Sequence, residues 1–119
     1  MSDYQLNVIG QVWILIIFYP IVSAIYYINS KSITQSAHGL LALFGFIYAV
    51  IACDFTDHAP AGIWYVPIYV FLFLSLASTA YSYKAFKGKK FVHLIHGVTI
   101  VANLLTAFVS LMAVAHDWI

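Results

Sequence analysis

Four long apolar stretches without a charged side chain constrain the fold of this chain more than any other feature. They are Val8–Ile28, Ala37–Cys53, Ile63–Tyr83 and Phe91–Ala115. Each approaches the roughly 20 residues that an α-helix needs to cross the hydrocarbon of a bilayer. We therefore predict an all-α integral membrane four-helix bundle. It would be a single transmembrane domain over residues 1–119, with spans at about 8–29, 36–54, 63–84 and 91–116.

The composition argues against a soluble domain and against a nucleic-acid partner. Hydrophobic residues make up 64% of the 119 residues and charged residues only 8%, whereas soluble domains average about 25% charged residues. All five basic residues are lysines, so the bidentate arginine donor that phosphate and nucleic-acid sites favour is missing. Cys53 is the single cysteine, which excludes an internal disulfide and an all-thiolate metal site.

Charged residues segregate between the two sides of the predicted spans. The lysines fall between the first and second spans and between the third and fourth; they are Lys31, Lys84, Lys87, Lys89 and Lys90. The acids all fall on the other side; they are Asp3, Asp54, Asp57 and Asp117. By the positive-inside rule, the lysine loops are cytoplasmic and both termini lie outside, in a cell inner (plasma) membrane. Tyrosines near the lysine loops, namely Tyr26, Tyr27, Tyr81 and Tyr83, are expected to form an interfacial belt.

The two predicted hairpins have like orientation, so a tandem duplication is one hypothesis for their origin. Shifting the chain by 58 positions places His38-Gly39 on His96-Gly97 and His58 on His116. Identity elsewhere is poor. If the repeat is real, the two helical hairpins are related by an axis along the membrane normal.

The repeated His-Gly step suggests a cofactor site. His38 and His96 each lie just inside the cytoplasmic end of a predicted span, on a face of small or polar residues. Two imidazoles at equal depth can ligate the iron of a haem b, and Gly39 and Gly97 would leave room for the macrocycle. We therefore predict a haem-binding electron-transfer or quinone-linked membrane subunit. The alternative is that both histidines are interfacial residues bonded to hydroxyls or water.

A weaker metal site is suggested on the opposite side. Asp54, Asp57 and His58 follow the second predicted span, and His116 ends the fourth. Imidazoles and carboxylates are ligands for zinc, copper or iron, but their spacing matches no metal-binding motif. A solvated loop is the alternative.

Other functions remain open at this stage. No phosphate-binding loop, nucleophile elbow or metalloprotease motif is present, so we do not expect an enzyme acting on its own. The first alternative to haem binding is a non-catalytic accessory, immunity-type or regulatory protein that binds a protein partner, or a second copy of the chain, in the lipid bilayer. A small oligomeric transporter or channel is the third hypothesis, weakened because no Asp, Glu, Lys or Arg lies within a predicted span.

Overall fold

The computed structural model describes residues 2–58 and 60–117, and in this part of the chain it is helical, with no strand. The elements are α1 (Asp3–Gln11), α2 (Trp13–Ser30), α3 (Ile33–His38), α4 (Leu41–Ala52), a 3₁₀ turn η1 (Gly62–Tyr65), α5 (Val66–Ala85) and α6 (Lys90–Ala115). The all-α prediction is confirmed for these residues.

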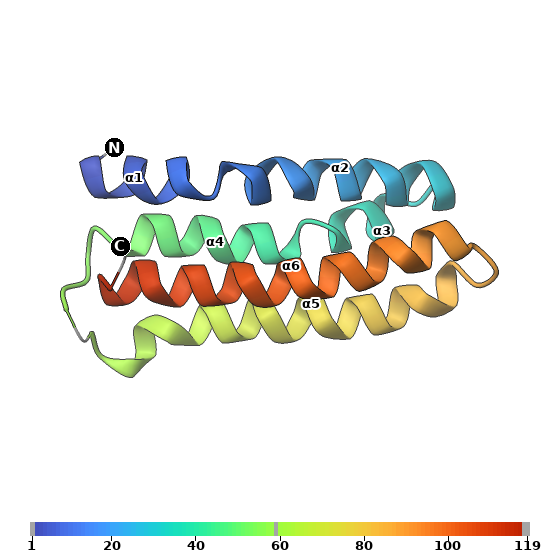
Figure 1. The fold of residues 1–119 in the computed structure, drawn as a ribbon. Coiled ribbons are helices and arrows are strands. Elements are labelled where there is room, and N and C mark those ends of the chain that lie inside the picture. Colours follow the sequence, from blue (N-terminus) through green and yellow to red (C-terminus); the bar gives the residue numbers. More distant parts are fainter. Residues whose placement is uncertain (1, 59, 118–119) are drawn as a thin grey trace.

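The helices lie side by side in an elongated molecule (Figure 1). Helices α1 and α2 follow one another along one rod, α3 and α4 along a second, and α5 and α6 run beside them. The principal extents are 47 × 25 × 21 Å. The start of α1 and the end of α6 lie at one end of the molecule, and the turn between α5 and α6 lies at the other.

Three segments are long and apolar enough to cross a membrane: Trp13–Ser30, Gly62–Lys84 and Lys90–Ala115. Helix α4 has 12 residues, or about 18 Å at the standard rise, which by itself is shorter than a hydrocarbon layer of about 30 Å. Large apolar side chains point outward along the long helices, and Ile14, Phe73 and Phe108 are each more than 60% exposed. Such apolar surfaces suit contact with lipid rather than water.

Two of the predicted continuous spans are interrupted. The first is divided at Val12, whose amide donates to the Ile9 carbonyl (3.2 Å), and the second at Gly39 and Leu40. The Leu40 amide donates to the Ala37 carbonyl (3.0 Å), a hydrogen bond of the tighter 3₁₀ type. Glycine lowers helix propensity by about 1 kcal/mol relative to alanine, so Gly39 is a position at which the helix can break.

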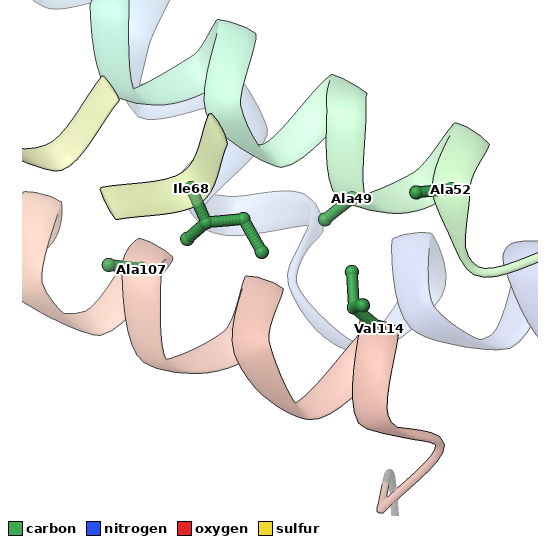
Figure 2. Close-up of a cluster of buried hydrophobic side chains, with 5 residues drawn as sticks. All are labelled: Ala49, Ala52, Ile68, Ala107 and Val114. Atoms are coloured by element: carbon green, nitrogen blue, oxygen red, sulfur yellow. The ribbon is translucent and has the colours of Figure 1, made fainter. Parts of the chain in front are cut away.

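Small side chains hold α4, α5 and α6 together. Figure 2 shows Ala49 and Ala52 of α4 facing Ile68 of α5 and Ala107 and Val114 of α6. A Cβ atom added at Gly45 of α4 would lie 3.0 Å from Cβ of Phe71 in α5. Close packing of small residues is a main source of helix association in lipid, where the hydrophobic effect gives no drive.

Polar side chains join the helices at mid-length. The Tyr19 hydroxyl of α2 donates to Oδ1 of Asn103 (3.0 Å) and shares a hydrogen bond with Oγ1 of Thr106 (2.8 Å) in α6. Tyr19 is 1% exposed, and both partners are buried. These contacts attach α2 to α6 by specific hydrogen bonds as well as by packing.

Candidate functional site

The residues predicted to bind a cofactor lie at the end of the molecule that carries the α5–α6 turn. His38 ends α3, and His96 lies in the second turn of α6. Tyr26 of α2 lies against His96, with ring centroids 5.2 Å apart, and its Cδ2 lies 3.3 Å from the position of a Cβ at Gly39, the residue that follows His38. We call Tyr26, His38 and His96 the histidine–tyrosine cluster.

His96 is enclosed by aromatic rings. It is 4% exposed, with the Tyr26 ring on one side and the Phe86 ring centroid 5.5 Å away. Its Nδ1 atom lies 3.5 Å from Nδ1 of His93, and the His93 ring stacks on Tyr83 at 4.3 Å. Nε2 of His96 is buried and has no hydrogen-bond partner. One imidazole nitrogen therefore has a polar neighbour, and the other has none among the described residues.

His38 is less enclosed than His96. It is half-buried at the end of α3, and its ring meets Tyr81 of α5 edge-on, with centroids 6.4 Å apart. Its Nδ1 atom is buried and has no partner. The Tyr26 hydroxyl is also buried and has no hydrogen-bond partner; the neighbouring Thr99 hydroxyl donates to the Ile95 carbonyl instead. Within residues 2–58 and 60–117, the unpaired buried side-chain nitrogen and oxygen atoms are these three, one on each member of the cluster.

Polar groups around the cluster are paired, which sets the cluster apart. Oγ of Ser23 and Oγ of Ser36 lie 2.6 Å apart, joining α2 to α3. Oγ of Ser82 in α5 donates to Oε1 of Gln35 in α3 at 2.6 Å, and both side chains are buried. An unpaired buried polar atom costs about 1–3 kcal/mol. Three of them at one end of the molecule, beside satisfied neighbours, call for an explanation such as a bound ligand or water.

The two glycines of the His-Gly steps have opposite environments. A Cβ at Gly39 would lie 3.3 Å from both Cα and N of Ser23, so Gly39 is a contact between α3 and α2 and not an open surface. Gly97 is exposed, and a Cβ there would meet nothing within 4 Å. The expectation that both glycines leave room beside the histidines is thus wrong for Gly39. An exact repeat would require the two His-Gly steps to have equivalent surroundings, and they do not.

Donor chemistry at the cluster fits a haem, but the closed packing does not. Unpaired buried imidazole nitrogens are what haem iron requires. Two small cavities of about 10 Å³ each have room for roughly one water apiece. One is lined by Gly45 and Asn103, among others, and the other by Tyr19 and Phe46, among others; neither is lined by His38 or His96. A macrocycle between the two imidazoles requires α2 and α3 to separate from α6.

Tyr26 and Gln35 were not identified from the sequence as interior residues. The sequence pattern predicts that Tyr26 belongs to the interfacial belt, but in the structure the Tyr26 side chain is only 2% exposed. Tyr27, Tyr81 and Tyr83 are exposed, as a belt requires. A spacing of three residues places Ser23 and Tyr26 on one face of α2, and this is the signal that distinguishes Tyr26 from Tyr27.

The weaker metal cluster at the opposite end is dispersed. Asp54 accepts a hydrogen bond from Oγ of Ser2 at 2.8 Å, and Asp57 is exposed. Nε2 of His116 is 2.7 Å from the Cys53 carbonyl, and its ring stacks on Tyr4. His58 pairs with Asp117 at 3.6 Å. Among the described residues, no group of three or more His, Cys, Asp or Glu side chains is arranged to hold a metal ion.

Helix ends are capped by side chains at this same end of the molecule. The last carbonyls of α4 and α6 have no partner within their own helices. Nε2 of Gln5 donates to the Val50 carbonyl at 2.7 Å, and the Tyr4 hydroxyl donates to the Ala113 carbonyl at 3.0 Å. Oγ1 of Thr56 donates to the Val114 carbonyl at 2.8 Å. These bonds give the polar residues of this end a structural role.

Comparison with known proteins gives no relative: no protein-family model, curated protein or solved structure matches this chain.

Proposed function

We propose that the chain crosses a cell inner membrane four times, with both termini outside. Helices α3 and α4 together cover residues 33–52, and 20 residues are about the length of one crossing. The α3–α4 rod lies alongside α6 (Figure 1). The lysines at one end and the acids at the other support the orientation.

We further propose that the protein is a ligand-binding membrane subunit whose site is the histidine–tyrosine cluster. The observation that carries this proposal is the set of three unpaired buried polar atoms, on Tyr26, His38 and His96. Buried polar groups in a membrane protein are costly and are typical of functional sites. Haem b is the proposed ligand because two imidazoles from different helices are its common axial ligands. Because the packing around His96 is closed, its binding would require α2 and α3 to separate from α6. When bound, it would supply one-electron transfer, as in an electron-transfer or quinone-linked subunit.

The absorption spectrum of the detergent-purified protein tests the haem proposal. Protein produced with ample haem should show, on reduction, the sharp bands of a six-coordinate low-spin b-type haem. His96→Ala and His38→Ala should each abolish or convert that spectrum, because each removes one axial ligand. His58→Ala is the matched control, since it removes an exposed imidazole at the other end of the molecule.

His93→Ala distinguishes a ligand from a supporting residue. Its Nδ1 atom neighbours Nδ1 of His96, and loss of such an outer partner typically weakens metal affinity by about 10- to 100-fold. We expect the variant to retain less haem but to keep the low-spin spectrum. Colourless wild-type protein with intact helical content would contradict haem binding. The non-catalytic accessory protein would then be the better proposal.

A further inference from the structure

Five exposed lysines converge at the end of the molecule opposite the termini. Lys84 lies in the last turn of α5, Lys87 in the α5–α6 turn, and Lys89 and Lys90 at the start of α6. Lys31 follows α2. Nζ of Lys89 donates to the Asn29 carbonyl, so the α5–α6 turn touches the end of α2. We call these five residues the lysine patch.

No carboxylate balances the lysine patch. The four acids of the sequence are Asp3, Asp54, Asp57 and Asp117. Asp3 begins α1, Asp54 and Asp57 follow α4, and Asp117 follows α6, all at the other end of the helices (Figure 1). The patch therefore carries five formal positive charges and no negative charge.

The turn that carries most of the patch is anchored in the interior. Phe86 is fully buried and packs with Val22 and Tyr26 of α2 and Val92 of α6. Gly88 has a φ of 85°, a conformation that glycine adopts without strain. Lys87 and Lys89 flank this glycine, so a fixed backbone presents them. The buried anchor reduces the entropy that a ligand would otherwise lose by ordering the turn.

Aromatic side chains place the patch at the level of lipid headgroups. Tyr81, Tyr83 and Phe91 are each more than 55% exposed and lie within one or two helical turns of the lysines. Exposed aromatic rings near the ends of apolar helices are typical of the membrane interface. The charged ammonium groups would therefore lie among the phosphates of one leaflet.

We propose that the lysine patch binds the phosphodiester headgroup of an anionic phospholipid from the surrounding bilayer. Clusters of four to eight basic residues next to a membrane helix bind anionic lipids, each contributing about 1 kcal/mol, or about fivefold in affinity. The inference rests on the proposed membrane embedding of the helices. It does not depend on what the histidine–tyrosine cluster binds.

Lipid titration of the purified protein tests this proposal. Phosphatidylglycerol is added to protein in neutral detergent micelles that contain phosphatidylcholine, and bound lipid is counted by native mass spectrometry. Lys87→Gln combined with Lys90→Gln should weaken phosphatidylglycerol binding by about 25-fold. Lys89 is left in place because it bonds to Asn29. Lys87→Arg combined with Lys90→Arg keeps the charge and should retain binding.

Three results would overturn the proposal. The first is unchanged phosphatidylglycerol binding by the double glutamine variant, with intact helical content. The second is equal binding of phosphatidylcholine, which has no net charge. The third is displacement of the lipid by millimolar inorganic phosphate, which would identify a soluble anion as the ligand.

Asp57→Asn is the control for a charge change at the other end of the molecule and should leave phosphatidylglycerol binding unchanged. The haem spectrum of the same samples reports on the histidine site separately.

Discussion

The hydrogen atom that Gly39 carries in place of a side chain sets how closely α3 approaches α2. Its backbone φ of −67° and ψ of −12° are accessible to any residue, so conformation does not require glycine there. The lack of space does require glycine, because the atoms nearest a new Cβ include Cα and N of Ser23, which belong to a helix backbone. A backbone moves less readily than the end of a side chain.

Gly39→Ala should therefore lower the free energy of unfolding by about 1–3 kcal/mol, the usual cost of overpacking. Gly97→Ala is the matched control. It lies in α6 with open space around it, and alanine should stabilise the helix by up to about 1 kcal/mol. Denaturation in detergent micelles, followed by circular dichroism, measures both. Equal effects of the two substitutions would contradict the close contact at Gly39.

The histidine pair shows what the sequence predicts about a site and what it leaves out. The position of each histidine within its predicted span places His38 and His96 at the same end of the molecule. In the structure both lie at the end with the α5–α6 turn. The Tyr26 contact depends on how α2 rotates against α3 and α6. That rotation is set by packing such as the contact between Gly39 and Ser23, which no spacing rule gives.

At the scale of elements, α1 is a short helix that side-chain hydrogen bonds join to α4 and α6. Ser2 and Gln5 form a capping box at its start. The same Gln5 side chain donates through Nε2 to the Val50 carbonyl of α4. One residue thus stabilises the beginning of α1 and attaches α1 to α4.

Gln5→Leu should loosen α1 without unfolding the long helices. The Val50 carbonyl would lose its amide donor and keep the weaker Sγ donor of Cys53 at 3.0 Å, and loss of a buried hydrogen bond typically costs about 1–3 kcal/mol. Amide hydrogen exchange in α1 should accelerate by about 5- to 160-fold while exchange in α5 stays the same. Gln11→Leu is the control, because Gln11 is an exposed glutamine of the same helix. Acceleration spread evenly over α1 and α5 would indicate global destabilisation instead.

Element boundaries follow from the sequence where one helix runs the full length of an apolar stretch. The predicted third and fourth spans, 63–84 and 91–116, correspond closely to η1 with α5 and to α6. The breaks at Val12 and Gly39 could not be predicted in this way. Both breaks lie within stretches that contain no charged residue. Such a stretch is suited to lipid whether or not its helix is continuous.

For the molecule as a whole, length and charge distribution agree with one orientation in a bilayer. The longest extent is 47 Å, close to the 40–45 Å of a bilayer with its headgroups. The lysine patch lies at one end, and the helix termini with the four acids lie at the other. A bilayer-spanning arrangement would therefore expose each charged end to a different aqueous compartment.

Reporter fusions test this orientation. A reporter that is active only outside the cytoplasm should be active when fused after residue 119, because the proposed orientation places the lysine patch at the cytoplasmic end by the positive-inside rule. The same reporter inserted after Gly88 in the α5–α6 turn should be inactive, and a cytoplasm-only reporter should give the reverse pattern at both positions. Activity of the cytoplasm-only reporter after residue 119 would mean that the orientation is inverted. Activity of one reporter type at both positions would mean that α6 does not cross the membrane. An inverted orientation would also move the histidine–tyrosine cluster, whose His96 packs against Phe86 of the α5–α6 turn, away from the cytoplasmic half of the bilayer.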